Sequence, residues 1–312
     1  MSPIRPTLPG VAETFAPILV PGEPAVVRGP FDPVVLAADI RLVATLFTEE
    51  LGRVREGAWA HRSGRSADAW TVHDIVGHMA TIAESANATA AAALAAAAVP
   101  PPGLPEHGAV AAWNRERVDR TRGQPTIITV DRLLGALEAA AEFAEALSPG
   151  DAARSIRIPT YDRPVRVDEA LSVQVSHSLV AHGAQLAAAT GLEPPWAHLG
   201  PDPRHRVLER LFQQMTVLYD PARGGELRAL VAFEIGGAGG GAWWLAIAPE
   251  EVRAGRGAVA RPTVTFRIVN TSVAFLLFSH RLNLPLALLR RRLRLVGDLG
   301  LAMRFPQLVD AG

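Results

Sequence analysis

Two histidines lie on apolar faces of separate helical segments, where acid–base or metal chemistry is possible. In residues 169–191, leucines and valines recur at helical spacing together with His182, so this ring is expected to point into an interior. His78 shares a similar stripe with Ile75 and Met79. A buried imidazole needs a partner, and two rings that converge from facing helices could share a proton or a metal ion. Whether these two rings meet is therefore the functional question.

Four helical regions are expected to position these side chains. Asp32 before Pro33 predicts a helix start, and Thr71 with Asp74 forms a capping-box pattern ahead of His78. Antiparallel packing of four such helices makes a bundle, whose interior is a usual place for metal and ligand sites. The expected regions are 33–54, 71–99, 113–147 with an interruption at 123–125, and 167–190.

The composition changes after a proline-rich stretch that follows Gly191. Strand-like runs then alternate with short helices, which predicts a compact α+β domain. The glycines at 236–241 are read as a hairpin turn rather than a phosphate loop. The expected strands are 227–235, 242–249, 261–269 and 293–298, and the expected helices are 204–218, 271–279, 284–292 and 299–309. The predicted division is an extended arm at 1–30, a helical bundle at 31–192, a linker at 193–203 and an α+β domain at 204–312.

Composition narrows the classes of partner and compartment. All 31 basic residues are arginine and 31 acidic residues balance them, so no basic field favours nucleic acid. With no cysteine, any reactive thiol must come from a ligand. The alanine-rich stretch 86–99 is shorter than the roughly 18 apolar residues of a membrane span. We expect a cytoplasmic monomer or homodimer, and the arginine and alanine bias indicates GC-rich, actinobacterial coding.

The first domain resembles the DinB-like bundle of mycothiol-dependent maleylpyruvate isomerases and thiol transferases. The likeness rests on the run from Trp70 to His78, on Asn114, and on HGAQLAAATG beginning at His182. The second domain resembles sterol-carrier-protein-like domains, most clearly over 293–308. This resemblance implies mycothiol as co-substrate and a divalent metal, most readily zinc. It also matches Arg281, in AFLLFSHRLNLP, to a functional arginine of the isomerases.

The resemblance implies a metal shell of one histidine on the second helix and a Glu/His pair four residues apart on the fourth. Here Ser178 stands where the acidic ligand is expected. His177 is five residues before His182, about 140° away around an ideal helix, so it is expected to point elsewhere unless a π-bulge intervenes. The metal hypothesis therefore assigns His78 and His182, completed by water, a ligand or a distant donor such as His107. The alternative is two hydrogen-bonded core histidines.

The leading hypothesis is a mycothiol-dependent or related transferase or isomerase that acts on a small electrophile in a pocket between the domains. His78, His182 and Arg281 are its predicted catalytic residues, with the arginine holding an anionic group of the substrate. The rival is a non-catalytic or metal-independent protein whose second domain binds an apolar ligand, either a lipid or a specialised metabolite. The predicted substrate contacts are Trp70, Asn114, Ser178, Gln185 and Trp243.

Overall fold

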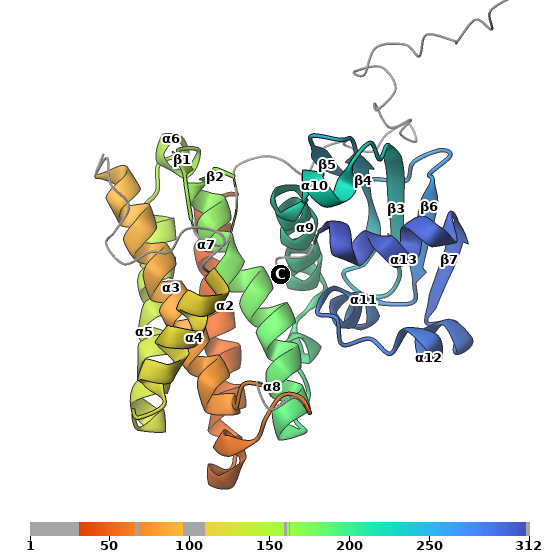
Figure 1. Ribbon diagram of the computed structural model, residues 1–312. Coiled ribbons are helices and arrows are strands. Elements are labelled where there is room, and N and C mark those ends of the chain that lie inside the picture. The colour runs from red at the N-terminus through yellow and green to blue at the C-terminus, as the bar shows by residue number, and fades with distance from the viewer. Residues whose placement is uncertain (1–30, 66–68, 96–109, 159–160, 162, 310–312) are drawn as a thin grey trace, which may run out of the picture.

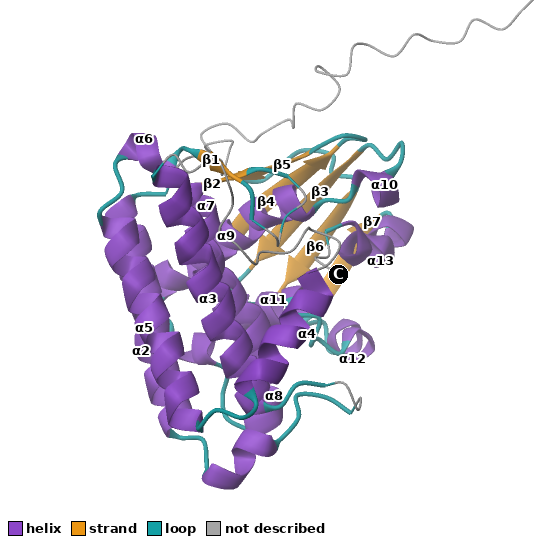
Figure 2. Ribbon diagram, turned by 60° about the vertical axis from the view of Figure 1, so that its left-hand side comes forward, coloured by secondary structure: helices purple, strands orange, loops and turns teal. Residues whose placement is uncertain are grey.

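A helical bundle stands beside a smaller mixed domain in the computed structural model (Figure 1), which describes residues 31–65, 69–95, 110–158, 161 and 163–309. The expected arm at 1–30 lies outside these residues. Figure 2 shows the bundle helices lengthwise, with the sheet as a separate layer beside them. The predicted fold class, a helical bundle followed by an α+β domain, is confirmed. Among the described residues, no helix has the length and apolar character needed to cross a bilayer.

The bundle is built from the helical regions that the sequence predicts, with the third region divided in two. Its first elements are α2 (Pro33–Gly52), η1 (Glu56–Ala60), α3 (Val72–Leu94), α4 (Val110–Thr121), α5 (Thr126–Glu145) and α6 (Pro149–Ala152). A small hairpin, β1 (Ser155–Ile156) with β2 (Val165–Arg166), leads into the last bundle helix, which comprises α7 (Val167–Ser176), the π-helix η3 (His177–His182) and α8 (Gly183–Thr190).

Local signals fix where the two site-bearing helices begin and end. The Thr71 hydroxyl accepts the Asp74 N–H, and the Asp74 carboxylate accepts the Thr71 N–H, so the predicted capping box starts α3. At the start of α7, the Glu169 carboxylate accepts the backbone N–H of Arg166 at 2.8 Å. Gly191, with a φ of 75°, ends α8 in the left-handed conformation that glycine tolerates.

The second part of the chain contains the predicted strands and helices, and in addition the strand β5 and the short helices η4 and α10. Its elements are η4 (Pro195–His198), α9 (Pro201–Leu218), α10 (Pro221–Gly224), β3 (Ala229–Ile235), β4 (Gly241–Ile247), β5 (Val252–Arg256), β6 (Val264–Ile268), α11 (Thr271–Phe278), α12 (Leu284–Leu289), β7 (Leu293–Gly297) and α13 (Leu299–Leu308). The sheet order is β5-β4-β3-β6-β7, with β3 parallel to β6 and the other pairs antiparallel.

One face of this sheet is aromatic and is covered by helices. Phe233 on β3 and Phe266 on β6 pair in register, and their rings stack with centroids 4.9 Å apart. Phe212 on α9 contacts Phe233 at 5.0 Å, and Phe305 on α13 contacts it at 5.5 Å. The core of the second domain is therefore a layer of rings between the sheet and α9, α11 and α13.

Helix α9 also joins the second domain to the bundle. Arg206 and Arg210 on α9 donate to the carboxylate of Asp39 on α2, with nitrogen–oxygen distances of 2.7 and 2.5 Å. The Arg210 side chain is 2% exposed, so this contact is a buried ion pair. The predicted linker at 193–203 includes η4 and the first turn of α9. The exact domain boundary stays a prediction.

Glu50 is a buried carboxylate near the end of α2, and its replacement by glutamine should stabilise the protein in a pH-dependent way. Glu50 is 2% exposed, one of its oxygens has no hydrogen-bond partner within the described residues, and burial raises its pKa. The folded state therefore holds this proton more tightly than the unfolded chain does, and the wild type loses stability as the pH rises through the folded pKa. Glu50→Gln removes the buried charge and should stabilise the protein by about 1 kcal/mol at pH 7.

That gain should vanish below the ordinary glutamate pKa of about 4.3, where the wild-type side chain is also neutral. Thermal unfolding of both proteins at pH 7 and near pH 4 measures it. An advantage of equal size at both pH values would contradict the assignment to a buried charge.

Candidate functional site

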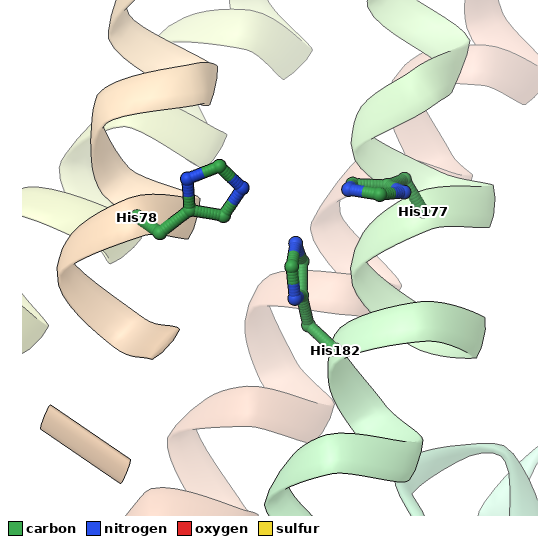
Figure 3. Close-up of side chains that lie close together, drawn as sticks. All are labelled: His78, His177 and His182. Atoms are coloured by element: carbon green, nitrogen blue, oxygen red, sulfur yellow. The ribbon is translucent and has the colours of Figure 1, made fainter. Parts of the chain in front are cut away.

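Three histidines from two helices meet at one point between α3 and the last bundle helix (Figure 3). The ring centroids of His78 and His182 are 4.9 Å apart, those of His177 and His182 are 4.4 Å apart, and those of His78 and His177 are 6.5 Å apart. One nitrogen of each ring lies within 4.8 Å of the other two. We call His78, His177 and His182 the histidine cluster. The expected meeting of His78 and His182 is found, while their roles stay predictions.

The expectation that His177 points away from His182 is wrong, and the reason is the π-helix η3. In an α-helix, hydrogen bonds join residues four apart, whereas in a π-helix they join residues five apart. The N–H of Gly183 donates to the carbonyl of Ser178, five residues earlier. This wider turn places residues five apart on the same face, so His177 and His182 point toward the same partner on α3. The π-turn that the helical geometry requires is present at this position.

Burial keeps the rings of the cluster neutral at physiological pH. His78 and His182 are each 4% exposed. Burial, together with the neighbouring His177 ring, lowers the pKa of His78 to about 3. Burial also lowers the pKa of His177 to about 4, and burial with repulsion from both neighbours lowers the pKa of His182 well below its ordinary value. Neutral imidazoles are the form that binds metals or accepts protons.

Gln185 fixes which nitrogen of His182 faces the cluster. The side-chain oxygen of Gln185 lies 2.8 Å from Nδ1 of His182. With the amide in this orientation the oxygen accepts, so Nδ1 carries the hydrogen and Nε2 presents a lone pair. Nε2 is buried and has no hydrogen-bond partner among the described residues. A buried acceptor without a partner can be satisfied by a ligand such as a metal ion or a water molecule.

The histidine cluster suits a borderline-soft divalent ion such as zinc. It supplies three neutral nitrogens, and catalytic zinc sites commonly use three protein ligands with one position left open. The outer hydrogen bond from His182 to Gln185 is the kind that orients a ligating ring. The donor His107, considered as a distant ligand, lies outside the described residues. His177, rather than the neighbouring Ser178, is the third residue with a ring nitrogen close to those of His78 and His182.

A cavity of about 430 Å³ opens beside the cluster, between the bundle and the second domain. The last bundle helix, α9, the aromatic face of the sheet, α11 and α13 all contribute to its wall. His177 and Gln185 line the cavity, whereas His78 and His182 lie behind His177 and are not among its lining residues. His177 therefore connects the buried cluster to a space large enough for a small molecule.

Arg281 also lines this cavity, as the isomerase resemblance implies for a substrate-binding arginine. It follows α11, and its Nη1 donates to the backbone carbonyl of Ser63, 2.8 Å away, in the loop that precedes α3. Arg281 is exposed, and no carboxylate among the described residues forms an ion pair with it. The structure thus brings Arg281, His177 and Gln185 to one space.

The other predicted substrate contacts lie in different surroundings. The Trp70 ring packs against His78 with centroids 4.5 Å apart, so it supports the cluster. Ser178 is buried within η3, and neither Ser178 nor Asn114 on α4 lines the cavity. Trp243 is fully buried, stacks on Phe212 at 5.3 Å, and is likewise not a lining residue. Its side of β4 faces the domain core, and the cavity lies farther along that face.

Comparisons with known proteins agree with this architecture. Residues 40–187 match the family model described as the mycothiol maleylpyruvate isomerase N-terminal domain. Residues 208–310 match the model of the SCP-2 sterol transfer family. The two matches cover successive parts of the chain, the first over the helical bundle and the second over the α+β domain. No curated protein matches the sequence.

Solved structures show the same combination of folds. A crystal structure of a mycothiol-dependent maleylpyruvate isomerase matches with a TM-score of 0.51 and 12% identity, over 79% of this chain and 88% of that one. A mutant of such an isomerase matches with the same TM-score and coverage at 10% identity. The sterol carrier protein domain 2 of Helicoverpa armigera matches 31% of this chain and 84% of its own, with 22% identity and a TM-score of 0.25. At such low identities, the isomerase matches establish the fold alone.

Proposed function

We propose that this protein is a mycothiol-dependent thiol transferase or isomerase that acts on an electrophilic small molecule in the cavity beside the histidine cluster. The observation that carries the proposal is the convergence of three neutral imidazoles at the wall of that cavity, with His177 reaching into it. The match of residues 40–187 to a mycothiol maleylpyruvate isomerase domain supports the choice of mycothiol as the thiol.

The cluster is proposed to hold one divalent ion, with zinc the best fit to three nitrogen ligands. When bound, such an ion supplies Lewis acidity that lowers the pKa of a thiol near it. The surrounding residues of the protein hold the three histidine rings in position. Gln185 holds the ring of His182, the π-helix sets the direction of His177, and Trp70 packs against His78.

The chemistry proposed for the cavity is addition of a thiolate to a carbon–carbon double bond conjugated to a carbonyl. The thiol proton is released to solvent, a sulfur–carbon bond forms, and the electron pair of the broken π bond moves onto the carbonyl oxygen. Return of that pair after rotation about the carbon–carbon bond expels the thiolate and gives an isomer, whereas protonation of the carbon gives a thioether. Arg281 would hold an anionic group of the acceptor during either outcome.

A second candidate function is non-catalytic binding of an apolar ligand. The observation that favours it is the wall of the cavity in the second domain, where Phe233, Phe266, Phe278 and Phe305 are lining residues. The match to the SCP-2 sterol transfer family over 208–310 points the same way. In this alternative the histidine cluster is a packed polar core, and no thiol is consumed.

Metal analysis and thiol consumption separate the two candidates. Protein purified without chelator should contain about one zinc per chain, and it should convert a conjugated electrophile to an isomer or a thioether only when mycothiol is present. A metal-free preparation that takes up no added zinc and shows no mycothiol-dependent conversion, but carries an apolar molecule in native mass spectrometry, would establish the binding function instead.

The hydrogen bond between Gln185 and His182 gives a further prediction. Gln185→Leu removes the acceptor that orients His182, so zinc affinity should fall by about 10–100-fold. Gln185→Glu retains an acceptor and should keep the affinity. A competition titration against a chromophoric chelator measures both variants. Gln214→Leu is a matched control, because Gln214 lines the same cavity but its side chain contacts Ser176 rather than the cluster. Equal losses of affinity in Gln185→Leu and Gln214→Leu would contradict the assigned role.

A further inference from the structure

The cavity has two ends of opposite chemical character. At one end, Phe233, Phe266 and Phe305 lie around one another with ring centroids 4.9 to 5.7 Å apart. Phe233 is fully buried and Phe266 and Phe305 are each 4% exposed, so these rings form the closed base of this end. The half-buried ring of Phe278 on α11, 6.0 Å from Phe233, faces the same space. Such a surface binds rings or hydrocarbon chains, because both stack on aromatic faces and leave water when they do so. A molecule made only of charged groups would not bind at this end, because its charges would lose water and find no polar partner there.

The other end of the cavity is polar and carries positive charge. His177 and Gln185 contribute from the bundle, and Ser279, His280 and Arg281 follow α11, with Arg281 joined to the bundle by its hydrogen bond to Ser63. Neither aspartate nor glutamate is among the described residues that line the cavity. The fixed charge of the lining is therefore the single guanidinium of Arg281. An anion placed there gains a charge-assisted hydrogen bond, and no carboxylate of the wall opposes it.

The two ends belong to one continuous space. Its volume of about 430 Å³ falls in the range of pockets that enclose a drug-sized molecule. A small molecule with two or three charged groups could use Arg281 for one of them, but the others would lie against phenylalanine rings without a partner. Leaving a buried charge unpaired is strongly unfavourable. A molecule with an apolar body and one anionic group satisfies both ends.

We propose that the acceptor for the thiol is an amphiphile, with an aromatic or aliphatic body among the phenylalanines, one anionic group at Arg281, and its electrophilic carbon beside His177. The electrophilic carbon of this substrate class rests on the proposed thiol-transfer function. The apolar body and the anionic group rest on the cavity alone. In this proposal, the apolar surface of the second domain binds the body of the substrate that reacts beside the histidine cluster.

A pair of dyes with one ring skeleton tests the substrate class without any reaction. Anilinonaphthalene sulfonate carries an aromatic body and one anion, and phenylnaphthylamine carries the same rings without the sulfonate. Both should bind the wild-type protein with enhanced fluorescence. Arg281→Met should weaken the sulfonate dye by about tenfold or more and leave the neutral dye unchanged. Arg290→Met, an exposed arginine outside the cavity, is the matched control.

A variant at the apolar end should act on both dyes. Phe278→Gln should weaken the two equally, because each loses the same ring contact. Thermal unfolding checks that the variant is folded. If it is not, Ala181→Phe replaces it, since Ala181 lines the cavity and a larger side chain fills the space without removing a core contact.

The outcomes distinguish this inference from the proposed function. Failure of both dyes to bind, or equal weakening of both by Arg281→Met, would overturn the substrate class. Protein that consumes mycothiol but turns over a compact, multiply charged electrophile faster than one with an apolar tail would also overturn it, while leaving the thiol-transfer proposal intact. Conversely, a protein that binds the dyes in the predicted pattern but shows no mycothiol-dependent reaction would contradict the thiol-transfer proposal. The proposal that the cavity binds an amphiphile would then stand.

Discussion

Protein in which His177 is replaced by alanine is expected to bind zinc at least about a hundredfold more weakly than the wild type. The variant loses one of three nitrogens that converge within 4.8 Å, and the serine next to it is a poor substitute because a neutral hydroxyl is a weak zinc ligand. His177 is also the cluster residue that faces the cavity. The loss should therefore appear both in a chelator competition titration and in the rate at which the electrophile is converted when mycothiol is present.

A histidine outside the cluster provides the control. His73 lies on α3 five residues before His78, and its Nε2 contacts the Thr129 hydroxyl at 3.0 Å. His73→Ala should retain the wild-type zinc affinity. If His177→Ala and His73→Ala bind zinc equally well, the π-helix does not serve a metal site, and the three rings are better described as a packed polar core.

Asp39→Ala is expected to produce the largest loss of stability, about 3–5 kcal/mol in the free energy of unfolding. Asp39 accepts from Arg206 and Arg210, and its removal leaves the 2% exposed guanidinium of Arg210 charged and without its carboxylate. Arg210 already has two buried nitrogens with no partner in the described chain, so it cannot compensate locally. Urea unfolding followed by tryptophan fluorescence measures the change.

An exposed ion pair gives the comparison for this loss. Arg41, also on α2, pairs with Glu138 and Glu145, but its side chain is 39% exposed and those of both partners are 50% exposed. Arg41→Ala should therefore change stability by no more than about 1 kcal/mol. The double replacement Asp39→Ala with Arg210→Met, which removes both buried charges, should recover much of the loss. Similar effects of Asp39→Ala and Arg41→Ala would contradict the assignment of a buried interdomain pair.

The ion pair matters for the site because α9 forms part of the cavity wall. Leu211, Gln214 and Met215 on this helix line the cavity, within two turns of Arg210. Loosening the contact between α2 and α9 should therefore weaken ligand binding as well as stability. The cavity is held in place by a charged contact that lies outside it.

Local sequence signals were sufficient for most of the fold. The capping box at Thr71 and the glycine at position 191 mark ends of helices that the structure contains. Such signals act within a few residues, so the sequence alone carries them. The strand β5 was missed, because Val252–Arg256 has only one large apolar residue and pairs as a short edge strand whose position depends on β4.

The site was harder to predict because it depends on geometry that periodicity does not encode. The spacing of an ideal helix, with 3.6 residues per turn, predicts that His177 points away from His182. The turn of η3 is wider, and it brings the two rings to one face. The spacing of the two histidines, five residues apart on one apolar helix, is the signal that could have favoured a π-turn. Alternation along a strand shows that Trp243 and Trp244 face opposite sides of the sheet, but it does not show which side borders a ligand. The stacking of Trp243 on Phe212 shows that its side faces the domain core.

Cobalt substitution tests the central claim most directly, namely that His78, His177 and His182 form a metal site at which a thiol binds. Protein loaded with Co²⁺ should show the visible absorption of a low-coordinate cobalt centre, and mycothiol should add a sulfur-to-cobalt charge-transfer band in the near ultraviolet. The band should be absent in His177→Ala and present in His73→Ala. Wild-type protein that binds no cobalt, or a cobalt protein whose spectrum mycothiol leaves unchanged, would contradict the account.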